Sequence, residues 1–147
     1  MRHVIAAFLT ALALLVVPAA PQASAMSNAT FDKKLFQQTN TSRAFRDIKK
    51  LKHHSCLNRY AHRQAKRMAA ERRMYHQNLG VVLRKCNMSR VAENVATGFT
   101  SPKANVRAWL KSPGHRRNML SRGYTRLATG VAKADGRTYT VQVFGRP

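Results

Sequence analysis

The stretch WLKSPGHRRNML, residues 109–120, is the most informative part of the chain because it ends one predicted helix and begins another. Ser101-Pro102 starts the first of these helices as N-cap and first helical residue. Pro113-Gly114 ends it, and residues 115–120 have the pattern of one or two further helical turns. Trp109 shares a face with other apolar residues of the first helix, so we expect it to anchor a core rather than to hold a ligand.

The C-terminal part of the chain carries a hairpin signal. Residues 127–134 and 137–144 flank Asp135-Gly136, a dipeptide typical of a two-residue turn between antiparallel strands. The second run alternates apolar and polar residues, which predicts a half-buried strand. Because a lone hairpin is marginally stable in water, we expect it to join further strands or to pack on helices.

Two helices are predicted in the N-terminal half. Residues 31–44 repeat apolar residues at helical spacing after a polar lead-in at residues 26–30. Residues 55–73 form the clearest helix of the chain, and Ser55 is a suitable N-cap. One face of this second helix is rich in alanine, which would let another element approach closely.

The pattern weakens between this helix and residue 101. From residue 74 to residue 90 the periodicity fades and Gly80 marks a turn, so we expect a loop with room for a short strand. Residues 91–96 are expected to form a short helix that ends at Gly98. The chain has no repeats, heptads or low-complexity tracts, and its length predicts a single domain over residues 31–147.

Residues 1–25 have the three regions of a secretion signal. Arg2 supplies the positive start, residues 4–17 contain one polar residue, and Ala23-Ser24-Ala25 has the small-x-small pattern that signal peptidase accepts. The alternative is a permanent membrane anchor, but a span needs about 20 apolar residues and this run is shorter. We expect cleavage after Ala25 and a secreted mature protein without a transmembrane segment.

The two cysteines, Cys56 and Cys86, indicate one disulfide if the chain is exported. Such a bridge would close a loop of about 31 residues and stabilise the fold by roughly 3–4 kcal/mol in the chain-entropy model. Two buried free thiols are the alternative interpretation.

The charge of the chain is strongly positive: 27 Lys and Arg against 5 Asp and Glu give +22. Loss of a signal with one basic residue, Arg2, would leave +21. Such a surface attracts polyanions. Outside the cell these are anionic envelope polymers, acidic lipids and shed nucleic acid, the last bound only as a non-specific polyanion. Basic residues that merely solvate the surface are the plainer interpretation, but they do not account for the scarcity of acids.

Familiar catalytic signatures are absent from the sequence: it has no GxSxG, HExxH or phosphate-binding glycine loop. Five acidic residues leave little scope for a mechanism that needs two carboxylates. Three segments nevertheless combine titratable and apolar residues, around His76, Glu93 and His115. Imidazole and carboxylate groups in one cleft could bind a divalent metal or relay a proton. Hydrogen bonding among them as a structural network is the alternative, and the residues alone favour it.

The order of the motifs resembles the CAP superfamily, which comprises cysteine-rich secretory proteins, antigen 5 and plant pathogenesis-related proteins, and above all its short bacterial secreted members. The matching motifs, in chain order, are Asn40-x-x-Arg43, the face formed by Leu57, Ala61, Ala65 and Met68, then His76, Glu93-Asn94-Val95-Ala96-x-Gly98, residues 109–120, and Tyr139-x-x-Gln142-x-Phe144-Gly145. This set covers most of the mature chain.

The resemblance implies an α+β fold: a three-layer α-β-α sandwich with a surface cleft, the C-terminal hairpin lying in the central sheet. In the family two histidines and two glutamates line the cleft, and the histidines can hold zinc or another divalent cation. His76, Glu93 and His115 match three of the four positions, and Ser112 stands at the fourth. A serine supplies no carboxylate, so the resemblance does not extend to an activity that needs all four groups.

Asn94 and Asn118 have a structural interpretation, because side-chain amides at element ends can satisfy backbone groups.

Three functions compete. The first is a secreted, non-catalytic binding module, expected to be a monomer, whose cleft takes a small apolar ligand and whose basic surface favours anionic envelope polymers or lipids. The second is a metal-dependent hydrolase with His76 and His115 as ligands and Glu93 as base. The third is a cationic antimicrobial or nucleic-acid-binding protein that acts mainly through charge.

Overall fold

The C-terminal hairpin forms the middle of the sheet. In the computed structural model, which describes residues 26–147, β3 (Arg126–Ala134) and β4 (Arg137–Arg146) pair in antiparallel register. Asp135 and Gly136 both have positive φ, 48° and 72°, as a type I′ turn requires, so the predicted hairpin is confirmed. β2 (Arg90–Thr97) pairs antiparallel with β4, and β1 (Lys52–His53) pairs parallel with β3, which gives the order β1-β3-β4-β2.

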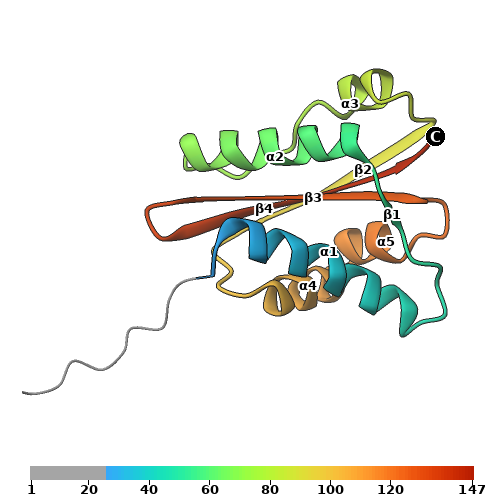
Figure 1. The fold of residues 1–147 in the computed structure, drawn as a ribbon, viewed down its shortest axis with the longest axis horizontal. Helices are drawn as coiled ribbons and strands as arrows, with labels where there is room; N and C mark the ends of the chain where they lie inside the picture. Colours follow the sequence, from blue (N-terminus) through green and yellow to red (C-terminus); the bar gives the residue numbers. More distant parts are fainter. Residues whose placement is uncertain (1–25) are drawn as a thin grey trace, which may run out of the picture.

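Helices cover both faces of this sheet (Figure 1). On one face lie α2 (Ser55–Ala70) and α3 (Leu79–Lys85). On the other lie α1 (Asn28–Ala44), α4 (Pro102–Lys111) and α5 (Pro113–Leu120). The three-layer α-β-α sandwich is therefore confirmed. The predicted secretion signal falls on residues 1–25, which lie outside the described residues.

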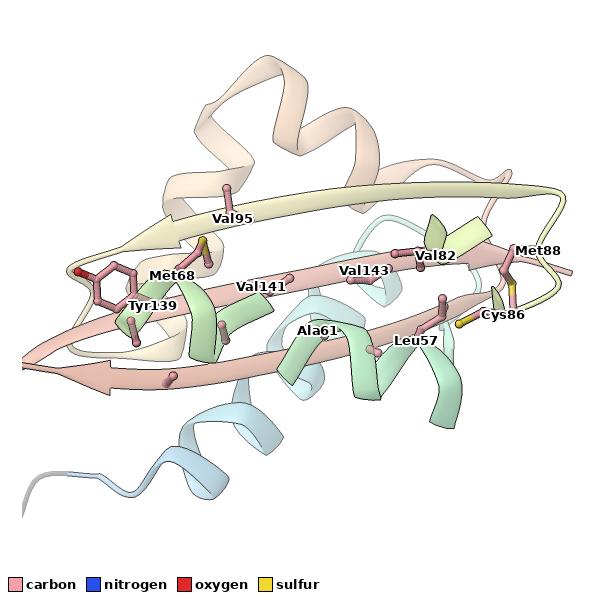
Figure 2. Packing of buried hydrophobic residues seen from close by; sticks show 14 residues of the cluster. Leu57, Ala61, Met68, Val82, Cys86, Met88, Val95, Tyr139, Val141 and Val143 are labelled. Atoms are coloured by element: carbon pink, nitrogen blue, oxygen red, sulfur yellow. The ribbon is translucent and has the colours of Figure 1, made fainter. Parts of the chain in front are cut away.

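Each face of the sheet carries its own apolar core. The core under α2 packs the predicted alanine-rich face of that helix on β3 and β4 (Figure 2). Contact there is close: a Cβ added to Gly130 of β3 would lie 2.4 Å from backbone atoms of Ala61. The core on the opposite face surrounds Trp109, which is 2 % exposed and donates its indole N–H to the Val95 carbonyl at 3.3 Å. The prediction that Trp109 anchors a core is confirmed.

β4 is buried on both faces, which corrects the prediction of a half-buried strand. Its polar residues face α1 and α4, where neighbouring groups satisfy them instead of water. Thr140 Oγ1 donates to Asn105 Oδ1 at 2.7 Å, and Thr138 Oγ1 donates to the Phe99 carbonyl at 2.6 Å. The apolar residues Tyr139, Val141 and Val143 therefore pack into the core under α2, whereas the alternating polar residues are buried on the opposite face through hydrogen bonds.

The ends of three helices test the predicted boundaries. α1 begins at Asn28 rather than residue 31, because the Ser27 hydroxyl caps it by accepting from the Thr30 N–H at 3.1 Å. The cap of α2 is His54, whose Nδ1 accepts from the Leu57 N–H at 3.4 Å, rather than Ser55. α2 ends at Ala70 instead of residue 73. The predicted start of α4 is confirmed, with Ser101 as its cap.

Two predictions between α2 and α4 are wrong. Residues 79–85, expected to be part of a loop, form α3, whose first turn is capped by the side chain of Asn78. Residues 91–96, expected to be a short helix, form most of β2. The apolar residues of this segment are buried on both faces of the sheet, so the alternation that identifies a strand is missing.

One disulfide joins Cys56, near the start of α2, to Cys86 at the end of α3, which confirms the predicted pairing. It holds α3 against the main helix of its layer. Within residues 26–147 no helix is long and apolar enough to cross a membrane.

Candidate functional site

His76 and Glu93, which sequence analysis singled out, are in direct contact. His76 Nδ1 lies 2.8 Å from Glu93 Oε1. Gln77 completes the arrangement, because its backbone N–H donates to Oε1 at 3.2 Å and its side-chain amide donates to Oε2 at 2.5 Å. Glu93 comes from the edge strand β2, and the segment after α2 is fixed in turn by Gln64, whose amide donates to the Tyr75 carbonyl at 2.7 Å.

The environments of the two partners differ sharply. The Glu93 side chain is fully buried, whereas the His76 side chain is 56 % exposed. Burial raises the pKa of Glu93, and the hydrogen bonds from Gln77 and His76 act against that rise. The Nε2 atom of His76 has no hydrogen-bond partner within the described part of the chain. The pair therefore presents one imidazole nitrogen to solvent and keeps the carboxylate inside.

A chain of buried amides holds the next residue of β2. Asn94 Nδ2 donates to Gln142 Oε1 at 2.9 Å and to the His115 carbonyl at 3.1 Å. Asn94 Oδ1 accepts from Asn118 Nδ2 at 2.9 Å. Gln142 Nε2 donates to the Thr39 hydroxyl at 2.6 Å. The network thereby joins α1, β4, β2 and α5 across one side of the sheet.

The network also reaches the backbone of Glu93, whose carbonyl accepts from Asn118 Nδ2 at 3.3 Å. The prediction that Asn94 and Asn118 satisfy backbone groups is confirmed. The predicted position of Asn94 at the end of an element is wrong, because this residue lies inside β2. Its amide is needed there because Gln142, opposite it on β4, is also buried and polar.

His115 belongs to α5 and lies beside β2, away from the Glu93 carboxylate. It lines a hollow of about 300 Å³ between β2 and α4, and its ring centroid is 6.5 Å from that of Trp109. Burial lowers the pKa of His115, and the charge of nearby His76 lowers it further. His115 forms no side-chain hydrogen bond with His76 or Glu93. The structure therefore joins two of the three predicted residues directly and places the third beside them.

The hollow itself is mostly apolar. Its lining residues, besides His115, are Met74, Val95, Ala96, Thr97, Phe99, Ala108, Trp109 and Ser112. Ser112, at the position where the family resemblance leads one to expect a carboxylate, thus faces a hydrophobic space. Met74, at the rim of the hollow, is 50 % exposed.

The donor groups near His76 decide whether a metal ion fits this site. The His76 and His115 imidazoles are two potential zinc ligands, but zinc sites in proteins have three or four protein ligands. Among residues 26–147 no group of three or more His, Cys, Asp or Glu is placed to hold a metal ion, and both oxygens of Glu93 already accept hydrogen bonds. These residues do not fit a resident zinc site. The metal and catalytic roles of the three residues stay predictions.

Sequence analysis gave no role of their own to Gln77 and Met74, which stand in the segment around His76, and it missed Phe99. The first supplies two of the three hydrogen bonds to Glu93, and the others line the hollow. Gln77 follows His76 directly, and this adjacency was the available signal. The two apolar residues carry no local pattern, because they meet the hollow only after β2 and α4 are assembled.

Fold and site together define a three-layer α-β-α domain in which a buried glutamate of the edge strand contacts a half-exposed histidine, with an apolar hollow beside the pair. A model of the cysteine-rich secretory protein family, CAP, matches residues 36–144, so the chain belongs to this family. YkwD of Bacillus subtilis (strain 168), an uncharacterized protein, is 27 % identical over 127 residues. That match covers 82 % of this chain and 49 % of YkwD, so the chain spans about half the length of this relative.

Solved structures share the fold. An outer surface protein from Borrelia burgdorferi matches with a TM-score of 0.75 and 20 % identity, over 82 % of this chain and 96 % of that one. An extracellular protein from Bacillus anthracis that contains an SCP domain matches with a TM-score of 0.68 and 24 % identity, over 90 % and 45 %. A cysteine-rich secretory protein from Staphylococcus aureus matches with a TM-score of 0.69 and 22 % identity, over 82 % and 39 %.

Proposed function

We propose that this protein is a secreted, non-catalytic binding module that takes a small, largely apolar ligand in the hollow beside His115. Its cationic surface keeps it close to anionic envelope polymers or lipids. The observation that carries the proposal is the hollow itself, about 300 Å³ in volume and lined mainly by apolar side chains. Ligand pockets of proteins begin near this size and combine an apolar lining with few polar groups.

His115 is the polar group that would orient such a ligand. Its lowered pKa favours the neutral imidazole, which donates one hydrogen bond and accepts another. Ser112 adds a hydroxyl in place of the charge that a carboxylate would bring. A neutral, mildly polar rim suits a ligand with one hydroxyl or carbonyl group on an apolar body.

The Glu–His pair is assigned a positioning role. A general base must reach the proton that it removes, but the Glu93 carboxylate is enclosed and both of its oxygens accept hydrogen bonds. Glu93 instead fixes the segment that holds Met74 at the rim of the hollow. The potential metal ligands in the described residues support this positioning role better than the role of a metal-dependent hydrolase, because no three of them are placed to hold a metal ion.

Secretion of this chain rests on the signal pattern of residues 1–25 and agrees with the extracellular description of the Bacillus anthracis protein. The disulfide between Cys56 and Cys86 suits an oxidising compartment.

The proposal is tested by filling the hollow. Ala108 lines it, whereas Ala104, one turn earlier on α4, is exposed and outside it, so Ala104→Phe is a matched control for Ala108→Phe. The neutral fluorescent probe Nile red is titrated into each protein. We expect saturable fluorescence enhancement with the wild type and the control, and at least a tenfold loss of affinity in Ala108→Phe.

Urea unfolding of both variants shows whether each is folded before its binding is compared. Equal probe binding by the two variants would contradict a ligand site in this hollow. Absence of saturable binding by the wild type would contradict the apolar-ligand part of the proposal and leave the cationic surface to be tested separately.

A further inference from the structure

Arg43 is a buried cation that no carboxylate of the described residues neutralises. It is 1 % exposed and donates hydrogen bonds to three backbone carbonyls. Its Nε donates to the Lys49 carbonyl at 2.9 Å, and its Nη1 donates to the carbonyls of Met119 at 2.7 Å and Ser121 at 2.9 Å. No carboxylate among residues 26–147 forms an ion pair with it. The carbonyls account for the position of the side chain, but they supply no negative charge. A buried charge of this kind is costly unless an opposite charge accompanies it.

Arg43 lines a pocket that is strongly basic. The pocket measures about 400 Å³ and lies where the segment after α1 meets the segment before β3. It holds six cationic residues and no acidic one, and the complete lining is Arg43, Ile48, Lys49, Lys50, Lys52, Arg122, Tyr124, Thr125 and Arg126. The remaining guanidinium nitrogen of Arg43, Nη2, has no hydrogen-bond partner in the described part of the chain. Burial, and then the charge of Arg122, lower the pKa of Arg43.

Phe45 is close in the chain to residues that line this pocket, and its ring is exposed. It is 85 % exposed, and the only other large apolar side chain exposed in the described residues is Met74. Phe45 lies between Arg43 and Ile48 in the chain, and both of these line the pocket. An exposed aromatic ring among Lys and Arg residues is the composition of a surface that enters the headgroup region of a lipid layer.

We infer that the basic pocket and Phe45 form a docking site for anionic phospholipid, in which the pocket takes a headgroup phosphate and the phenyl ring enters the acyl boundary. The inference rests on the cationic-surface part of the proposed function and assigns that function to one face. Charge complementarity favours a phosphate, because Arg and Lys side chains bind it directly and no carboxylate within residues 26–147 pairs with Arg43. Single-stranded nucleic acid is less well matched, because it needs successive exposed aromatic rings, and Phe45 is the one large apolar ring exposed in the described part of the chain.

The pocket is tested with two variants of equal charge. Lys50→Gln/Arg122→Gln removes two exposed cations from the pocket wall, and Lys103→Gln/Arg107→Gln removes two exposed cations from α4, outside this pocket. Binding to vesicles of phosphatidylcholine with 30 mol% phosphatidylglycerol is measured by sedimentation. We expect the pocket variant to lose about tenfold in affinity and the control to lose less than threefold. Equal losses would overturn the assignment.

Substitutions of Phe45 separate lipid insertion from base stacking. Phe45→Leu keeps an apolar side chain without a ring face, so it should bind the vesicles within about threefold of the wild type, whereas Phe45→Ser should lose several-fold. In Phe45→Trp we expect the new indole emission to shift to the blue on vesicles and to be quenched by brominated acyl chains. Loss in Phe45→Leu equal to that in Phe45→Ser, or an unshifted indole, would overturn the inference.

The two proposals fail in different ways. If the wild type binds anionic vesicles but the pocket and α4 variants weaken alike, the docking site is wrong and the cationic surface stands. If the wild type binds no vesicle even at low salt, both the cationic-surface proposal and the lipid site are wrong. Titration with inorganic tripolyphosphate then separates the phosphate source: binding that depends on Lys50 and Arg122, without vesicle binding, would replace lipid by a soluble phosphate.

Discussion

Glu93 illustrates at the scale of one residue how a buried carboxylate organises its surroundings. Its side chain is fully enclosed, and donors from the segment after α2 converge on its two oxygens. Sequence reasoning placed Glu93 and His76 in one structural network, and this geometry agrees with that interpretation. It gave Gln77, in the segment around His76, no role of its own, because an amide in a loop has no pattern until the strand that it contacts is known.

We predict that Glu93→Ala destabilises the protein much more than His76→Ala. Removing the carboxylate leaves the Gln77 donors without a partner in a closed site, which costs about 2 kcal/mol of unfolding free energy. The His76 side chain is more than half exposed, so its loss should cost below about 1 kcal/mol. Urea unfolding measures both values. A His76→Ala variant as unstable as Glu93→Ala would mean that the imidazole, rather than the amides, fixes the carboxylate.

His62 of α2 makes a contribution to folding stability that depends on pH. Its Nε2 lies 3.1 Å from Asp32 Oδ2 on α1, and this hydrogen bond raises the pKa of His62 above 6.5. The folded state then holds the proton more tightly than the unfolded state. Stability from this pair is therefore fully present below pH 6.5 and is lost as the pH rises through the raised pKa.

We predict that wild type and His62→Gln differ in unfolding free energy at pH 5.5 and converge by pH 8.5. The difference should stay below about 1 kcal/mol, because the His62 side chain is 37 % exposed and solvent screens the pair. Urea unfolding at intervals of half a pH unit measures it. A difference that grows with pH would show that the folded state prefers the neutral ring.

At the scale of the element, the contact between α2 and β3 depends on two small residues. Gly130 faces Ala61, and an added Cβ would lie 2.4 Å from that residue's carbonyl carbon and oxygen. Backbone atoms cannot move aside as a flexible side chain would, so the helix would have to lift from the sheet. The alanine-rich face of α2 predicted this close approach, but it did not identify the glycine on the other side.

We predict that Gly130→Ala destabilises the protein by about 3 kcal/mol, in the range for overpacked cores. Gly114→Ala is the control: Gly114 lies in α5, its added Cβ would meet nothing within 4 Å, and alanine is the better helix former. This control should be neutral or stabilising by up to about 1 kcal/mol. Thermal and urea unfolding compare them. A mild effect at Gly130 would indicate that α2 shifts easily on the sheet.

Strong local signals predicted the elements correctly, and weak ones did not. The hairpin has its Asp135-Gly136 turn and α4 has its Ser101-Pro102 start, and both are where the sequence indicates. β2 was predicted as helix because its burial on both faces removes the alternation of a strand. β1 has two residues, and α3 has seven with a glycine near its start. Tertiary contacts stabilise these short elements, so their own residues carry little information.

At the scale of the whole molecule, one sheet serves two cores and the site lies at its edge. β2 contributes Val95 to the core under α2 and α3, and it contributes Ala92 and Ala96 to the core around Trp109. Because β2 is an edge strand, groups from both layers can reach around it. His76 comes from the layer of α2 and His115 from α5. The family resemblance predicted this convergence, and residue patterns alone could not.

The charge of the molecule is largely uncompensated, and this leads to the last prediction. Among the described lysines and arginines only Arg72 and Arg73 pair with a carboxylate. Affinity for a double-stranded DNA fragment, used as a generic polyanion, should fall at least a thousandfold between 50 and 200 mM salt if about six phosphates are neutralised. The slope of log K against log salt should be unchanged in His76→Ala/His115→Ala, because it counts released counterions. Fluorescence anisotropy measures both. A shallow slope, or one altered by these substitutions, would mean that the site rather than the net charge governs polyanion binding.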